Sequence, residues 1–303
     1  MSEPTKLPDV AEGRLAASSF SSGLSVSDFA ACIDMGLEPV GLAQGYCAVR
    51  TASSVYFANA QQGGLGRSIS PFQVSAGDYV ENYQCPHGMV SAEHRMWGQN
   101  YQQPWIEATW KQGFTNAYAR MVKEATTLGA HGVVGVVDNV SRIGQEGILE
   151  FSIRGTAVRV PGLGVPSGGP WTTYLAGQRL AKIIEAGFAP VSIVAAVSSV
   201  RVWASCITEY LMEGSGMTMW VQGAESTEVE QIVSARTAAR SLVRDMARQQ
   251  LQGDQLHGVE LRVREHEYAK GDLEIQPVLR GNRIRRFKDF DPMPVPRLTV
   301  RLS

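Results

Sequence analysis

The chain has 303 residues, of which 44% are hydrophobic and 19% charged, and its formal net charge is −1. This is the composition of a globular protein with about two domains, and the near-zero charge argues against nucleic acid or an anionic membrane as a partner. No apolar run approaches the roughly 20 residues of a membrane span. The N-terminus lacks the apolar core of a signal peptide, and the four cysteines show no disulfide spacing. We therefore expect a cytoplasmic protein.

The first elements follow a polar segment, residues 1–18, which we expect to be a flexible arm. Ser27 is a suitable N-cap for a short helix over 28–35, and Gly36 is its expected end. A buried strand should then run over 37–49, with Pro39 near its start, where a missing N–H costs least.

A long helix and two strands complete the first half. Apolar residues from Phe114 to Leu128 recur at three- and four-residue steps, which predicts an amphipathic helix ending near Gly129. Strands are predicted over 133–140 and 148–160. The Pro- and Gly-rich stretch 161–170 then marks a linker.

The second half repeats this order of elements. A helix is predicted over 178–186, a buried strand over 191–200, and a long helix whose apolar positions run from Ile232 to Met246. Two strands, 259–265 and 273–284, close this half. In the tail, alternating Leu298, Val300 and Leu302 suggest a late edge strand.

Short segments of the two halves also match in sequence. Residues 29–50 align without a gap with 180–201, so that Gly36 falls on Gly187 and Pro39 on Pro190. Two further segments match: His131-Gly132-Val133 pairs with His257-Gly258-Val259, and Arg154-Gly155 with Arg280-Gly281. We interpret the chain as a tandem duplication.

The expected fold class is therefore α+β, with two duplicated modules. Each module should hold a mainly antiparallel sheet packed against a long helix and a short helix. The first module covers 19–160 and includes an aromatic-rich insert at about 60–110, and the second, diverged module covers 171–290. Residues 291–303 form the C-terminal tail.

Two motifs in the first half resemble a known family. They are Leu128-Gly129-Ala130-His131-Gly132-Val133-Val134-Gly135-Val136 and Arg154-Gly155-Thr156-Ala157-Val158. They resemble the YbjQ-type domains that are labelled "putative heavy-metal-binding". That resemblance covers roughly residues 20–160, and the second half looks like a diverged copy. It implies small α+β domains that assemble as rings, commonly of five subunits.

The insert contains possible metal ligands. Cys85, His87 and His94 offer a thiolate and two imidazoles, which suit zinc or another transition metal. Their spacing matches no standard zinc motif. The alternative is a well-packed loop with a buried thiol and hydrogen-bonded histidines.

Large aromatic residues are concentrated at the end of the insert. They are Trp97, Tyr101, Trp105 and Trp110. Aromatic side chains are enriched at protein interfaces, so an intersubunit contact is one interpretation. A local core beneath a long loop is the other.

The remaining candidates favour structural roles. His131 and His257 are expected at equivalent helix-to-strand corners, without the partner that catalysis needs. The glycine-rich segment 63–67 lacks the Lys-Ser/Thr of a phosphate loop, and Asp138 is expected to be solvated. No Ser-His-Asp or Cys-His arrangement stands out.

We therefore expect a non-enzymatic, self-assembling protein whose main partner is itself. A cyclic homo-oligomer, most simply fivefold, would be its form, and rings could build a larger shell-like particle. The alternative is a metal-handling protein that uses Cys85, His87 and His94. An enzyme with a site between the modules is the third hypothesis.

Overall fold

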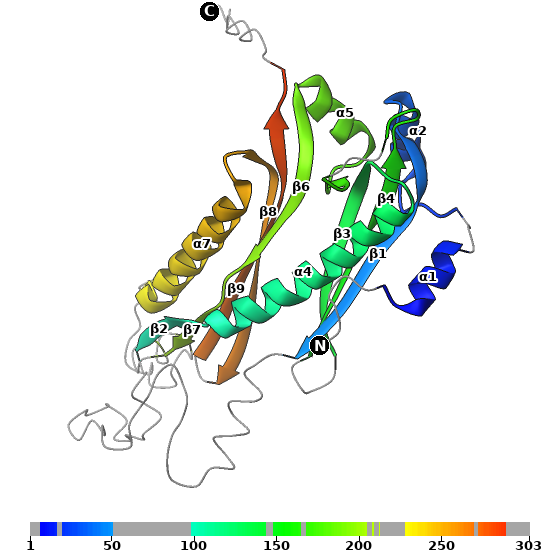
Figure 1. Cartoon of the computed structure of the whole chain (residues 1–303). Coiled ribbons are helices and arrows are strands. Elements are labelled where there is room, and N and C mark those ends of the chain that lie inside the picture. Colours follow the sequence, from blue (N-terminus) through cyan, green and yellow to red (C-terminus); the bar gives the residue numbers. More distant parts are fainter. Residues whose placement is uncertain are drawn as a thin grey trace, which may run out of the picture.

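The computed structural model describes residues 7–16, 20–50, 98–143, 148–164, 168–204, 208, 212, 228–269 and 272–288. Within these residues the chain is α+β, with two mainly antiparallel sheets and helices packed on them (Figure 1). The predicted fold class is confirmed. No helix in this part of the chain is both long enough and apolar enough to cross a membrane.

The first sheet has the strand order β1-β4-β3-β5. Its strands are β1 (Glu38–Arg50), β3 (Gly132–Ile143), β4 (Ile148–Arg159) and β5 (Trp171–Thr172). The three long strands pair antiparallel, and β5 adds to β3 in parallel. Buried residues alternate along most of β1, as expected when one face of a strand is covered.

Helix α4 (Pro104–Thr127) covers this sheet at very short range. A Cβ on Gly45 of β1 would lie 1.9 Å from the carbonyl oxygen of Ala117. A Cβ on Gly113 of the helix would lie 2.2 Å from the ring of Phe151. Only glycine fits at these two positions, so they set the distance between helix and sheet. The close approach fully buries Met121. Burial of this side chain stabilises the folded state by about 1.5–3 kcal/mol through the hydrophobic effect.

The second sheet is built on its central strand β9. Its strands are β2 (Gln99–Gln102), β6 (Phe188–Val197), β7 (Val200–Trp203), β8 (Gln255–Ala269) and β9 (Asp272–Arg286). The order is β2-β7-β9-β6, and β8 also pairs with β9. Helix α7 (Glu230–Leu251) packs on this sheet with its alanine- and valine-rich face, which includes Ala239 and Val243.

Three shorter helices complete the described structure: α1 (Asp9–Ala16), α2 (Val26–Asp34) and α5 (Gly177–Glu185). Ser25, rather than the predicted Ser27, caps α2, because its side chain accepts a hydrogen bond from the Asp28 N–H. Gly36 and Gly187 follow α2 and α5, each with φ of 76°, as predicted for residues that end a helix in the left-handed region.

The two sheets share one hydrophobic core. The inner face of β6 and β9, including Ile193, Val197 and Val278, belongs to the same buried cluster as Met121 and Phe151 of the first half. The halves also exchange short strands. β2 lies before α4 in sequence but pairs with β7, and β5 lies after the predicted linker but pairs with β3. Neither strand was predicted.

The order β1-β4-β3 in the first half matches β6-β9-β8 in the second, with the same antiparallel pairing. Both β1 and β6 are irregular just after their proline, Pro39 or Pro190. Both β3 and β8 have a bulge beside a glycine of positive φ, Gly135 or Gly258. The duplication itself stays a prediction.

The predicted equivalence of His131 with His257 is wrong by three residues. Val134 lies opposite Thr156, and His257 lies opposite Asn282, which is the counterpart of Thr156 in the aligned last strands. His257 is thus a residue of β8 and corresponds to Val134, whereas His131 precedes β3. The shared His-Gly-Val letters do not reflect the strand register.

Candidate functional site

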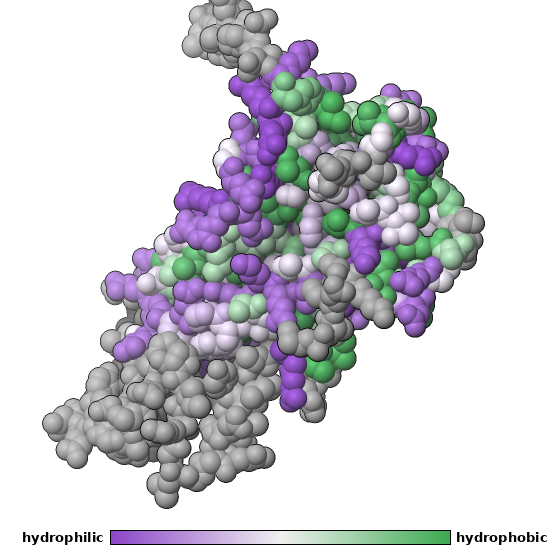
Figure 2. Space-filling model, viewed as in Figure 1, coloured by the Kyte–Doolittle hydropathy of each residue, from purple (hydrophilic) through white to green (hydrophobic). Residues whose placement is uncertain are grey.

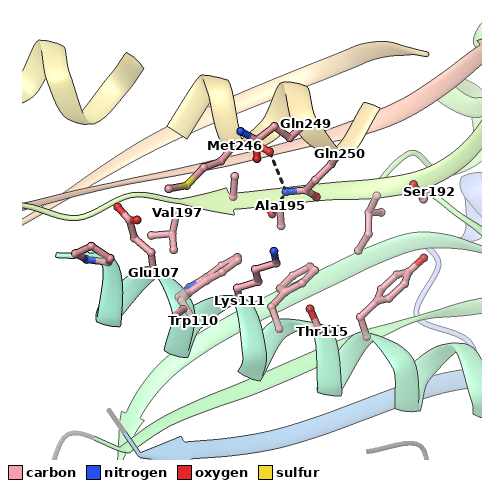
Figure 3. Close-up of a pocket in the computed structure, with 16 residues that line it drawn as sticks. Glu107, Trp110, Lys111, Thr115, Ser192, Ala195, Val197, Met246, Gln249 and Gln250 are labelled. Carbon is pink, nitrogen blue, oxygen red and sulfur yellow. Dashed lines mark hydrogen bonds between the residues drawn. The ribbon is translucent and has the colours of Figure 1, made fainter. Parts of the chain in front are cut away.

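A groove of about 710 Å³ runs between α4 and β6, with α7 along its other rim (Figure 3). Residues of both halves line it. Its lining includes Glu107, Trp110, Lys111 and Phe114 of α4, Ile193 and Val197 of β6, and Met246 and Gln250 of α7.

An aromatic row forms the α4 wall of the groove. Trp110, Phe114 and Tyr118 are four residues apart, so their rings follow one another along one helix face. The ring centroids are 5.1 Å apart for the first pair and 6.3 Å for the second, and both pairs are nearly parallel. Trp110 also meets Phe151 edge-on at 5.8 Å. Stacking of this kind adds about 0.5–1.5 kcal/mol per pair beyond burial.

The edge of β6 forms the floor. The Ile193 N–H donates to Oγ1 of Thr172 at 3.0 Å, and the Ala195 carbonyl accepts from Nε2 of Gln250 at 2.9 Å. Side chains from outside the sheet therefore satisfy backbone groups that a neighbouring strand would otherwise pair.

A buried polar cluster closes the end of the groove near the start of α4. Glu107 accepts hydrogen bonds from the Ser199 N–H at 3.1 Å and from Nε2 of Gln102 at 2.7 Å. The Ser199 hydroxyl donates to Oε1 of Gln103 at 2.8 Å. Burial raises the pKa of Glu107, and the hydrogen bonds from the Ser199 N–H and from Gln102 oppose this rise. The Ser199 hydroxyl also lies 3.1 Å from Oε1 of the buried Glu274. The cluster anchors α4 to the junction of β6 and β7.

A buried ion pair joins the two sheets. Arg280 of β9 holds both carboxylate oxygens of Asp138 on β3 at 2.7–2.8 Å, and the two side chains are 13% and 3% exposed. Asp138 was expected to be solvated, and this is wrong. The nearby Tyr174 is partly buried, and desolvation raises its pKa well above the usual value. The Asp138 carboxylate adds to the rise.

The predicted metal ligands and interface residues are only partly described. Cys85, His87, His94 and Trp97 lie outside the described residues. Tyr101 lies in β2, and Trp105 lies in the first turn of α4, because that helix begins ten residues before the predicted start at Phe114. Trp110 is 6% exposed and belongs to the core of the chain.

His131 has a structural role, as predicted. Its Nδ1 accepts a hydrogen bond from the Val160 N–H at 3.0 Å, and its Nε2 lies 2.8 Å from the Gly164 carbonyl, to which it can donate. Both ring nitrogens are therefore engaged. Among the described residues, no group of three His, Cys, Asp or Glu side chains could hold a metal ion.

The sequence prediction missed an exposed apolar face on α2. Val26 is 89% exposed and Ile33 is 51% exposed, one above the other at a seven-residue spacing. Phe29 lies between them and meets Phe20, which is 57% exposed, edge-on at 6.1 Å. Apolar surface gathers at the end of the molecule that carries α2 and α5 (Figure 2). The helical spacing of these residues was the available signal.

Part of the chain matches a known family model. Residues 99–161 match the family model YbjQ, described as "Putative heavy-metal-binding". This segment comprises β2, α4, β3 and β4, and it contains both motifs on which the resemblance rested.

The chain is also similar to a characterised protein. It is 29% identical over 264 residues to the Encapsulin nanocompartment protein Rv1762c of Mycobacterium tuberculosis (strain ATCC 25618 / H37Rv). The alignment covers 85% of this chain and 82% of the relative. No solved structure matches the chain significantly.

Proposed function

We propose that the protein assembles with copies of itself and serves as a component of a protein nanocompartment. The observation that carries this proposal is the similarity to the nanocompartment protein, which extends over 85% of the chain and so includes both sheets. A likeness of that extent is expected to preserve the surfaces through which subunits meet, and not only one domain.

Two features of the described residues support self-assembly. The long strands β1 and β8 are both sheet borders in this part of the chain, since β1 pairs only with β4 and β8 only with β9. On β1, side chains already bond the backbone of Leu42, Gln44 and Tyr46. β8 is therefore the border strand better placed to pair with another chain. The open apolar face of α2 adds a surface that water solvates poorly.

Native mass tests this proposal. Light scattering on purified protein should report a multiple of the 32.9 kDa chain, and electron microscopy should show particles of uniform size. A single-chain mass across the micromolar range would contradict the proposal. Particle size also separates a closed ring, for which fivefold symmetry is the form we favour, from a larger shell.

The aromatic segment is proposed as a further contact between subunits. Trp97, Tyr101 and Trp105 are its members, whereas Trp110 already packs inside the chain. Replacing Trp97 and Trp105 by alanine should lower the native mass, and not merely the stability of the chain. Trp110→Ala should instead destabilise the chain by about 3–5 kcal/mol, the usual cost of deleting a buried aromatic.

Metal binding is the second candidate, favoured by the description of the matching family. Within the described residues the side chains do not fit a metal site, so the proposed ligands remain Cys85, His87 and His94. Elemental analysis after growth with added zinc tests the idea. About one zinc per chain, lost in a variant with Cys85 and His87 replaced by alanine, is the expected result. Metal-free wild-type protein would rule it out.

A further inference from the structure

The two halves of the chain meet at a joint in which α5 of the second half lies against the first half. Leu180 is fully buried there, in one cluster with Cys32 of α2 and Val134 of β3. Gly177 touches α2 so closely that a Cβ would lie 2.2 Å from Oδ1 of Asp28. Ile184 packs against the same cluster. The face of α5 formed by Gly177, Leu180 and Ile184 is therefore covered.

The corresponding face of α2 is largely exposed to solvent. The helices correspond through Gly36 and Gly187, which end them with the same φ, so Val26, Phe29 and Ile33 occupy the positions of Gly177, Leu180 and Ile184. Leu180 is fully buried, whereas its counterpart Phe29 is only half-buried, and Val26 and Ile33 are 89% and 51% exposed.

The other side of the joint is also present twice. On the first half it includes Val134 of the β3 bulge, which is 0% exposed and lies in one buried cluster with Leu180. The neighbouring Val136, 3% exposed, belongs to the core that the two halves share. The strand register gives His257 and Val259 of β8 as their counterparts. His257 is exposed, and Val259 is 52% exposed. Each partner surface of the joint thus occurs once buried and once open.

We propose that the α2 face of one copy (Val26, Phe29 and Ile33) docks on the β8 bulge (His257 and Val259) of a second copy, repeating between chains the joint that exists within the chain. This inference rests on the self-assembly proposed above and identifies the surfaces that carry it. The two surfaces differ, so the contact is heterologous, and repeating it gives a closed ring or an open filament. Each contact removes from water the apolar side chains that the single chain exposes.

Two complementary variants test the docking. The α2 variant carries Val26→Asp and Ile33→Asp, and the β8 variant carries Val259→Asp. A buried carboxylate without a partner is strongly unfavourable, so either variant disables one of the two surfaces on every copy. The control is Val233→Asp, which changes a 41% exposed valine on α7. Circular dichroism verifies that all variants are folded.

Each variant alone should have the mass of one chain, while the control assembles like the wild type. An equimolar mixture of the two variants retains one intact surface of each kind, so it should form dimers and nothing larger. Variants that keep the wild-type mass, or a mixture without dimers, would overturn the docking while leaving self-assembly intact. A wild-type protein that is itself monomeric would overturn both. Loss of assembly in the control would also overturn the docking, because the effect would not be specific to these surfaces.

Discussion

At the scale of single residues, the Asp138–Arg280 pair shows how a charge can be required inside the chain. Both carboxylate oxygens are held by one guanidinium, and the pair is largely buried. In Asp138→Ala, Arg280 would remain buried without a counter-charge. Removing one partner of such a pair typically costs about 3–5 kcal/mol. We expect a loss of this size in the free energy of unfolding, measured by urea denaturation.

A surface pair provides the control. Asp245 and Arg248 lie one turn apart on α7 at 3.0 Å, and their side chains are 56% and 75% exposed. Asp245→Ala should cost less than about 1 kcal/mol, because water already screens an exposed pair. Similar losses in the two variants would show that Asp138 does not act through burial.

Asp254, in the turn between α7 and β8, provides a prediction on pH. Hydrogen bonds from Arg285 and Arg283, at 2.9 and 2.5 Å, lower its pKa from 3.8 to about 2. Because the folded value is below the unfolded one, the contact stabilises the fold above pH 3.8, and this contribution is lost as the pH falls toward 2. Carboxyl NMR titration should place the midpoint near the lower value, and Arg285→Ala should raise it. A wild-type midpoint near 3.8 would contradict the contact.

At the scale of elements, the contact between α4 and β1 depends on a missing side chain. In Gly45→Ala the new methyl group would overlap the backbone of α4, which cannot move aside as a side chain can. We expect a loss of about 1–3 kcal/mol or more in the free energy of unfolding. Gly164→Ala, at a position with no neighbour within 4 Å, should change stability little. Thermal melts of both variants make the comparison.

The elements that the sequence predicted well are those with local signals. Gly36 and Gly187 do end their helices, and the long strands lie within a few residues of their expected limits, because glycine turns and apolar runs are encoded close to where they act. α4 was predicted ten residues too short. Its first turns carry Trp105 and Trp110, which we interpreted as part of a loop. In the structure this part of the helix packs on the second sheet as well as the first, so its apolar residues do not follow a single face.

The elements that were missed depend on distant partners. β2 and β5 are only four and two residues long. β2 belongs to the first half but pairs with β7 of the second, and β5 belongs to the second half but pairs with β3 of the first. The Asp138–Arg280 contact likewise joins residues 142 positions apart. The three-residue error in matching His257 to His131 has the same origin. The cross-strand register, and not the local sequence, determines which residues correspond. None of these features has a local sequence signature.

At the scale of the whole molecule, the two halves do not behave as separate domains. The cluster around Met121 and Phe151 extends into β6 and β9, and the strands β2 and β5 are exchanged between the sheets. Separating the halves would expose this shared core and break the buried ion pair. Stability is therefore expected to be a property of the full chain, even if the halves arose by duplication.

This predicts a single cooperative unfolding transition. Circular dichroism, which reports on both sheets, and tryptophan fluorescence, which reports in part on Trp110 in the shared core, should give coincident denaturation curves at each protein concentration. The common midpoint should rise with concentration if folding and assembly are linked by mass action. Residues 1–160 expressed alone should unfold at a much lower temperature than the full chain, because β6 and β9 no longer cover α4. Two separate transitions in the full chain would mean that the modules fold independently and that the shared core contributes little to stability.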